Sequence, residues 1–292
     1  MYVIAGVTGH TGRAAAETLL GNGQKLRVIV REAKQGEPWK ARGAEVAVAS
    51  FTDAATLTQA LSGAQGGYLL VAPGMHAEDL LAAQHAQVEA MSQAVRKSGL
   101  PHLVFLSSVG AELADGTGPV RGLHHAEVTL AKAAKNATFL RPGYFFENFG
   151  MVLPATQGGV LPTFMTPGKA IPMAATADVG RIAAECLLEP ASGTRVVEIA
   201  HSPNHTPEDI AAALTEILGR PIALQAGPLD AVVPTFTSMG IPKGSAELYR
   251  EMISAFNSGR IRHQGPPATR RFCQLGPVDV LRGMLAATPT HA

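Results

Sequence analysis

The sequence predicts an α/β fold in which a doubly wound parallel sheet is joined to a smaller C-terminal α/β lobe. Three observations support this prediction. Short β-type runs alternate with helical patterns through the first 140 residues, a glycine-rich turn joins the first run to the first helix, and prolines and glycines break the pattern from Gly150 onward. We therefore expect a first domain over 1–150 and mainly a substrate-binding lobe over 151–292.

Six short runs rich in apolar and β-branched residues form the predicted sheet. They lie at 3–5, 26–30, 45–48, 67–71, 102–106 and 138–140. Helical patterns lie between most of them, at roughly 13–22, 53–62, 78–98 and 122–135. Each is long enough to cross over from one parallel strand to the next, so helices are expected on both faces of one sheet.

The second half of the chain contains a segment that we expect to return to the sheet. A helix is predicted after Thr176, with capping chemistry from Thr176 and Asp178, and a strand follows it to the sheet edge. This returning segment, near 176–200, is assigned to the first domain. A further helix is expected to begin at Thr206, where Pro-Glu-Asp follows, and to end at Gly219.

Composition and charge limit the possible partners. Lys and Arg number 24 against 23 Asp and Glu, a formal net charge of +1, so no broad charged field would attract nucleic acid or an anionic membrane. The chain starts directly in a strand pattern and has no long apolar run, so neither export nor a membrane span is expected. Cys186 and Cys273 match no metal-ligand spacing, so we expect ordinary thiols, no metal, and a reducing cytoplasm.

A glycine-rich turn follows the first predicted strand and opens the first predicted helix. It reads Gly6-Val7-Thr8-Gly9-His10-Thr11-Gly12-Arg13. In this context Gly9 and Gly12 are expected to let backbone N–H groups approach a pyrophosphate at the helix N-terminus, and Ala15 is assigned the close packing of helix on strand. The turn therefore predicts a Rossmann-type dinucleotide site. The expected contacts are Gly6, Thr8, Gly9, His10, Thr11 and Gly12.

The residue at the end of the second strand selects the cofactor. An acid there binds the ribose 2′-hydroxyl of NAD, whereas a cation binds the 2′-phosphate of NADP. Arg31 occupies this place, with two further cations nearby in sequence, so NADP is favoured over NAD. A solvated strand-end charge is the alternative. After the third strand, Phe51 is placed against adenine, while Asp53 or the residue before it caps the next helix.

Four segments resemble the NmrA-like family of atypical short-chain dehydrogenases. They are VTGHTG at 7–12, VIVR at 28–31, LSSVG at 106–110 and LRPGYFFEN at 140–148. The resemblance covers most of the chain. The family includes NADPH:quinone oxidoreductases, triphenylmethane-type reductases and isoflavone-reductase-like enzymes, and also transcriptional co-regulators that bind the dinucleotide without turning it over. The resemblance therefore implies the cofactor but not the reaction.

The proton-relay residues of the wider superfamily are absent. That superfamily uses a Tyr and a Lys four positions later on one helix. The segment LHHAEV at 123–128 is similar to places where relatives read Lys-Ala-Glu, which puts His125 at the Lys position and Arg121 at the Tyr position. By this resemblance, His125 would hold the nicotinamide ribose, which we favour, or protonate an oxyanion; a polar histidine at a helix start is the alternative. His124 is expected to face solvent or the neighbouring loop.

The remaining site residues end the other predicted strands, because ligands of open α/β sheets bind at the carboxyl edge. Val71-Ala72-Pro73 would offer bare backbone to the ribose and nicotinamide. Ser107 and Ser108 either contact the nicotinamide or cap the strand end. By resemblance, Pro142-Gly143-Tyr144-Phe145 borders the nicotinamide and leads into the substrate cleft, with a core-packing turn as the alternative.

These features predict an NADPH-dependent reductase of a flat, conjugated, apolar small molecule such as a quinone. Hydride transfer to such an acceptor needs little proton relay, because the anion formed is itself stable and position supplies much of the catalysis. The alternative is a non-enzymatic NADP-binding redox sensor, which would act through a protein partner. The sequence leaves the oligomeric state open, and a homodimer is compatible with it.

Overall fold

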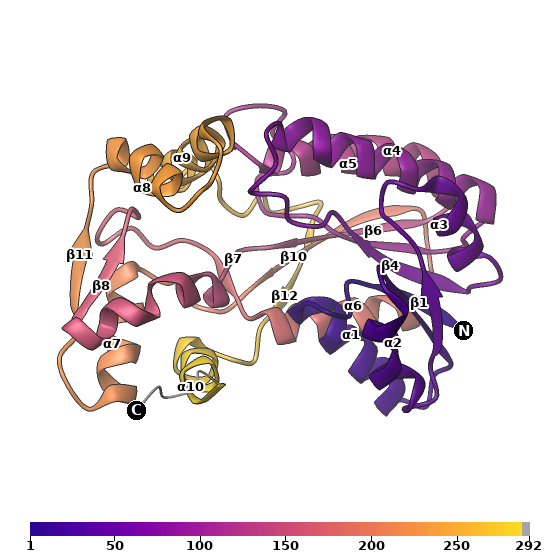
Figure 1. The fold of residues 1–292 in the computed structure, drawn as a ribbon, viewed down its shortest axis with the longest axis horizontal. Coiled ribbons are helices and arrows are strands. Elements are labelled where there is room, and N and C mark those ends of the chain that lie inside the picture. Colours follow the sequence, from indigo (N-terminus) through magenta and orange to yellow (C-terminus); the bar gives the residue numbers. More distant parts are fainter. Residues whose placement is uncertain (288–292) are drawn as a thin grey trace.

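An eight-stranded parallel sheet organises the computed structural model, which describes residues 1–287 (Figure 1). The strand order is β12-β10-β6-β5-β4-β1-β2-β3. The strands are β1 (Tyr2–Ala5), β2 (Leu26–Val30), β3 (Glu45–Val48), β4 (Gly66–Leu70), β5 (Leu103–Leu106), β6 (Ala137–Pro142), β10 (Thr194–Ala200) and β12 (Thr269–Phe272). The order reverses between β1 and β4, where a crevice forms at the carboxyl ends. The predicted doubly wound, Rossmann-type sheet is confirmed.

Helices cover both faces of this sheet (Figure 1). One face carries α1 (His10–Gly21), α2 (Ala33–Lys40) and α6 (Thr176–Leu188), and the other carries α3 (Ala54–Leu61), α4 (Leu80–Ser98) and α5 (Val120–Ala133). Each face has its own apolar core, with Leu19 and Ile182 buried on the first and Met91 and Phe105 on the second. None of the helices within the described residues is long and apolar enough to span a membrane.

A second lobe lies beside the sheet, on the left of Figure 1. Its elements are β7 (Tyr144–Phe145), the 3-10 helix η1 (Phe146–Gly158), β8 (Val160–Thr163), β9 (Met173–Ala174), α7 (Pro207–Leu218), β11 (Ala223–Ala226), η2 (Leu229–Ala231), α8 (Val232–Ser238), α9 (Lys243–Ser258) and α10 (Pro277–Ala287). Phe146, Leu214 and Phe256 belong to a third apolar core that holds these elements together.

The chain returns from the second lobe to the sheet twice. The strand predicted to follow the helix after Thr176 is β10, but it lies inside the sheet and not at its edge, because β12 pairs beyond it. β12 was not predicted. The division of the chain near residue 150 stays a proposal, and α6, β10 and β12 all cross back over it.

The start of α6 corrects the predicted capping. Ala175 occupies the cap position, and neither Thr176 nor Asp178 caps the helix with its side chain. Asp178 instead accepts hydrogen bonds from the backbone N–H groups of Gln274 and Leu275, at 2.9 and 2.8 Å. Its carboxylate therefore ties α6 to the chain that leaves β12, a contact between segments too distant in sequence for local patterns to predict.

The start of α7 agrees with its prediction. Thr206 Oγ1 accepts a hydrogen bond from the Asp209 backbone N–H at 3.2 Å, and the Asp209 carboxylate accepts one from the Thr206 N–H at 2.8 Å. Gly219 ends the helix with φ of 65°, a left-handed conformation that favours glycine. Local capping chemistry was sufficient to predict both ends of this helix.

The two cysteines are buried as free thiols. Burial raises the pKa of Cys186 to about 11 and that of Cys273 to about 12. Both groups therefore stay protonated and unreactive at neutral pH, which is the behaviour of ordinary thiols.

Candidate functional site

The turn between β1 and α1 forms the floor of the site. Gly6 has φ of 70°, and a Cβ there would lie 2.6 Å from Leu70 Cδ2, so the bend requires glycine. At Gly9 a Cβ would meet only the Gly6 carbonyl oxygen, at 3.4 Å. α1 begins at His10, and the backbone N–H groups of His10 and Thr11 bind no carbonyl of residues 1–287. Free donors at the positive end of a helix favour a phosphate.

Gly12 does not line the cleft, and its position gives it a packing role. A Cβ on Gly12 would lie 2.4 Å from the Gly6 carbonyl oxygen and 2.5 Å from that of Ala5. α1 therefore approaches the end of β1 closely at Gly12, the position that the prediction gave to Ala15. Ala15 is instead buried against α6, where a Cβ on Gly180 would lie 2.8 Å from the Ala15 nitrogen.

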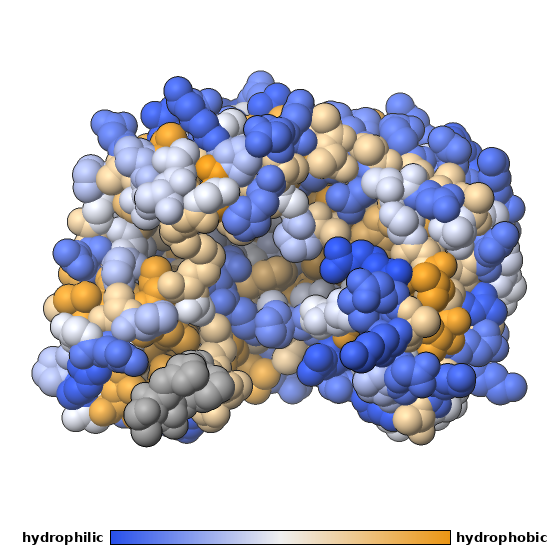
Figure 2. Space-filling view, viewed as in Figure 1, coloured by the Kyte–Doolittle hydropathy of each residue, from blue (hydrophilic) through white to orange (hydrophobic). Residues whose placement is uncertain are grey.

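The glycine turn opens into a cleft of about 760 Å³ at the carboxyl edge of the sheet. Figure 2 shows the hollow between the sheet and the second lobe. The predicted site residues that line the cleft are Gly6, Thr8, Gly9, His10, Thr11, Arg31, Phe51, Val71, Ala72, Pro73, Ser107, Pro142, Gly143, Tyr144 and Phe145. The structure thus brings every predicted site residue except Gly12 and His125 to one cleft.

One end of the cleft carries the cation predicted to select the cofactor. Arg31 is exposed at the end of β2, and Gln35 Oε1 accepts hydrogen bonds from the backbone N–H groups of Arg31 and Glu32, both at 3.3 Å. Phe51 lies in the same wall. Asp53 caps α3 as predicted, and hydrogen bonds from the backbone at the start of α3 hold the pKa of its carboxyl below the usual value.

Behind the other end lies a buried ion pair. Ser107 Oγ donates a hydrogen bond to Glu127 Oε1 at 2.5 Å. Arg141 binds both oxygens of the Glu127 carboxylate, at 2.8 and 2.6 Å, and its third nitrogen reaches Glu112 and Gln264 at 3.0 and 2.8 Å. Burial disfavours the charge on Arg141, but its hydrogen bonds to Glu127 and the nearby carboxylates outweigh burial and raise its pKa.

His125 lies outside the cleft. Its ring contacts the ring of His85 on α4, with centroids 4.1 Å apart, and its Nε2 lies 3.3 Å from the Glu89 carboxylate. His125 therefore belongs to the interface between α4 and α5, and its position does not support the predicted ribose or proton-donor role. His124 faces the neighbouring loop, as expected, with Nδ1 2.9 Å from the Ala111 carbonyl oxygen.

Sequence reasoning missed much of the opposite wall. α4, α5 and α9 supply Leu80, Gln84, Val120, Leu123, Tyr249, Met252 and Phe256. The Tyr144 ring packs edge-on against Phe149 and Phe256, with centroids 5.9 and 5.8 Å away. The wall is mainly apolar and aromatic, which suits a flat, conjugated molecule. The spacing of the α9 residues, i, i+3 and i+7, was visible in the sequence but did not say which surface they face.

Two oxygens of residues that line the cleft are buried and have no hydrogen-bond partner within residues 1–287. They are Gln84 Oε1 and Glu147 Oε2. The other Glu147 oxygen accepts hydrogen bonds from the backbone N–H and hydroxyl of Thr176, at 2.9 and 2.5 Å. Gln84 Oε1 lies against Gly122 on α5, where a Cβ would be only 1.9 Å away, so it is packed between the two helices. Buried acceptors are normally satisfied, so Glu147 Oε2 fits a ligand that carries an N–H donor, such as a carboxamide.

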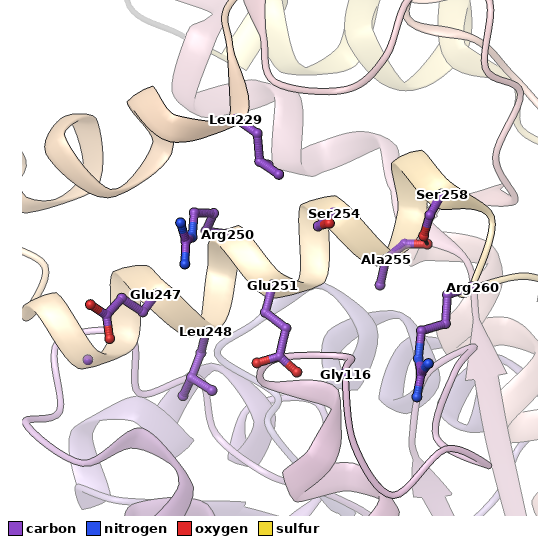
Figure 3. Close-up of a pocket in the computed structure, with 11 residues that line it drawn as sticks. Gly116, Leu229, Glu247, Leu248, Arg250, Glu251, Ser254, Ala255, Ser258 and Arg260 are labelled. Atoms are coloured by element: carbon purple, nitrogen blue, oxygen red, sulfur yellow. Dashed lines mark hydrogen bonds between the residues drawn. The ribbon is translucent and has the colours of Figure 1, made fainter.

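A second cavity, of about 520 Å³, lies on the other side of α9 (Figure 3). Charged side chains dominate it, among them Glu247, Arg250, Glu251 and Arg260. We assign the functional site to the larger cleft, because the glycine turn and the strand ends open into the cleft and not into this cavity.

The chain is similar to known NAD(P)H-dependent oxidoreductases in sequence and in fold. The sequence matches the NmrA-like family over residues 2–266. It is 23% identical to an NAD(P)H azoreductase of Xenophilus azovorans over 99% of this chain and 92% of that protein, and 28% identical to quinone oxidoreductase 2 of Escherichia coli over 85% of each. The structure of the NADPH-dependent quinone oxidoreductase of Escherichia coli with NADPH superposes with a TM-score of 0.78 at 25% identity, covering 91% of this chain and 92% of that one.

Proposed function

Because the chain belongs to the NmrA-like family, we propose that it is an NADPH-dependent oxidoreductase that reduces a flat, conjugated acceptor such as a quinone. One observation carries the proposal: a single cleft combines a phosphate-binding turn, a cation at the end of β2 and an aromatic wall. The relatives named as a quinone oxidoreductase and an azoreductase support this class of acceptor.

The residues of the cleft fit NADPH from end to end. The free N–H groups at the start of α1 hold the pyrophosphate, Arg31 holds the 2′-phosphate, and Phe51 lies against the adenine. Glu147 accepts a hydrogen bond from the carboxamide at the other end. When bound, the cofactor supplies a hydride.

The acceptor site needs mainly orientation and exclusion of water. Tyr144, Met252 and Phe256 enclose a flat molecule beside the strand ends, which holds it close to the reactive carbon of the cofactor. A quinone becomes a stable anion on reduction, so catalysis does not depend on the missing Tyr and Lys pair.

A screen of acceptors tests the proposed function. Oxidation of NADPH is measured with quinones, azo dyes and enones, and binding of NADP and NAD is titrated in parallel. We expect turnover with at least one acceptor class and tighter binding of NADP than of NAD. Tight binding of NADP with no turnover of any acceptor would contradict the enzyme and favour a redox sensor.

Arg31→Ala is expected to weaken NADP binding selectively. One charge-assisted hydrogen bond contributes about 1.5–3 kcal/mol, so Kd for NADP should rise roughly 10- to 100-fold while Kd for NAD stays almost unchanged. Titration calorimetry with both cofactors measures this. Arg42→Ala is the matched control, because Arg42 pairs with Glu17 on the surface and lies outside the cleft. Equal losses of affinity for NADP and for NAD would show that Arg31 does not bind the 2′-phosphate.

His125→Ala is expected to leave both cofactor binding and turnover unchanged, within about twofold. The ring contacts His85 and Glu89 and does not line the cleft, so its loss affects only packing between α4 and α5. Steady-state kinetics over a range of pH measure the effect. A loss of the pH dependence of kcat in this variant would instead place His125 in the reaction.

A further inference from the structure

The hydroxyl groups at the end of β5 have no hydrogen left for a ligand. Ser107 Oγ donates to Glu127 at 2.5 Å, and Arg141 donates to both oxygens of the same carboxylate. Ser108 Oγ donates to the Val109 carbonyl oxygen at 3.0 Å. A serine hydroxyl has one hydrogen, so neither side chain can donate to an acceptor molecule while these bonds hold.

A different hydroxyl enters the cleft from α9. Tyr249, Met252 and Phe256 all line the cleft, and their spacing places them on one face of the helix. Glu247 and Glu251 lie on the other side and border the smaller cavity (Figure 3). The helix therefore separates a charged surface from an apolar one, and Tyr249 is the polar group that it presents to the cleft.

The Tyr249 hydroxyl is available to a ligand. Its ring packs on Phe236, with centroids 5.6 Å apart, but the hydroxyl makes no hydrogen bond to any group of residues 1–287. Burial raises the pKa of the phenol, so it keeps its hydrogen at neutral pH. The other phenol in the wall is Tyr144, where burial raises the pKa and a hydrogen bond from Asn148 lowers it by less.

We propose that Tyr249 is a catalytic residue that donates a hydrogen bond to the oxyanion of the reduced acceptor; this inference rests on the proposed function. A hydride leaves the reduced nicotinamide with its electron pair and passes to the quinone. NADPH is oxidised to NADP⁺, and the quinone is reduced by two electrons to the hydroquinone monoanion. The Tyr249 hydroxyl stabilises the negative charge as it develops, and the monoanion then takes one proton from water.

The test compares Tyr249→Phe with the wild type on a series of quinones whose hydroquinone anions range from weakly to strongly basic. Removing one donor to a developing oxyanion typically lowers kcat about 10²- to 10³-fold. We expect about a 100-fold loss with the most basic anion, a much smaller loss with the least basic one, and an unchanged Kd for NADPH. If Tyr249 had only a structural role, Tyr249→Phe would lower the rates with all the quinones by the same factor.

Three further variants sharpen the result. Tyr2→Phe makes the same change at a residue that does not line the cleft, and it should match the wild type. Tyr144→Phe removes the other hydroxyl of the wall and should change the rates with all the quinones by a similar factor, because Tyr249 is the donor to the oxyanion. Tyr249→His, which returns a ring N–H donor, should recover part of the rate with the basic quinones even if Tyr249→Phe melts at a lower temperature.

Several outcomes would overturn the role of Tyr249. They are an unchanged rate in Tyr249→Phe, a loss that does not depend on the basicity of the anion, or a dependence that appears in Tyr144→Phe instead. Failure of the wild type to oxidise NADPH with quinones, azo dyes and enones alike is a different result, because it would overturn the proposed function itself.

Discussion

Gly9→Val is expected to abolish binding of NADP while the protein stays folded. Gly9 has φ of −102° and ψ of −179°, which valine can adopt, and a Cβ there meets only one carbonyl oxygen at 3.4 Å. The branched side chain would occupy the space above the free N–H groups of α1, where the pyrophosphate binds. We expect Kd to rise roughly 100-fold or more, about 2.8 kcal/mol, with a melting curve close to that of the wild type.

Two other glycines of α1 are the controls. Gly12→Val places its Cβ 2.4 Å from backbone atoms of Gly6, so it should destabilise the fold by about 4 kcal/mol or more. Gly21→Val points into open space at the other end of α1 and should leave both binding and melting unchanged. Undiminished NADP binding by Gly9→Val would mean that the phosphates lie elsewhere.

Arg141→Met is expected to cause a large loss of stability. Arg141 and Glu127 are 5% and 9% exposed, so the substitution leaves a carboxylate buried without its guanidinium. Breaking one side of a buried pair typically costs about 3–5 kcal/mol. Denaturant unfolding measures this change in the free energy of unfolding. Because the same carboxylate orients Ser107, the backbone N–H groups at the end of β5 should also exchange their hydrogen with solvent faster.

Two comparisons separate burial of the charge from loss of packing. The double variant Glu127→Leu, Arg141→Met removes both charges and should be more stable than Arg141→Met alone. Arg42→Met breaks a pair whose partners are 46% and 49% exposed, so it should cost less than about 1 kcal/mol. Equal losses in the free energy of unfolding for Arg42→Met and Arg141→Met would contradict the claim that an unpaired, buried Glu127 carboxylate is what destabilises Arg141→Met.

The sheet and most of the cleft could be predicted because their signals are local. Each of the six predicted strands exists, with ends that differ from the prediction by no more than a few residues, since buried parallel strands are short apolar runs between turns. The same strands end at one edge of the sheet. Residues that follow a predicted strand, such as Arg31 and Pro142, therefore had to meet at the cleft.

The features that were missed depend on contacts between distant segments. α2 contains Gly36 and Pro38, which indicate a break, yet a Cβ on Gly36 would lie 2.3 Å from Val46 Cγ1, so close packing on β3 requires the glycine. β12 reads Thr-Arg-Arg-Phe and is polar because it is an edge strand. α9 joins the cleft only through the folding of the second lobe.

The position of His125 shows where reliance on a resemblance went wrong. Val120 and Leu123 face the cleft, and Glu127 reaches Ser107 from the same side of α5. His125 is two residues from Leu123, about 200° around the helix, so it points away. The apolar spacing of α5 indicates that His125 faces away from the cleft. The resemblance of 123–128 to the Lys-Ala-Glu segment of relatives predicted the opposite orientation.

An anaerobic single-turnover experiment tests the central claim most directly. The protein is loaded with one equivalent of NADPH and mixed with one equivalent of a quinone, and the near-ultraviolet absorbance of reduced nicotinamide is followed together with that of the quinone. We expect both to disappear at the same rate and in equal amounts, and both to persist with Gly9→Val at the same concentrations. Stoichiometric binding of NADPH by the wild type, with its absorbance unchanged by quinones, azo dyes and enones alike, would contradict the account.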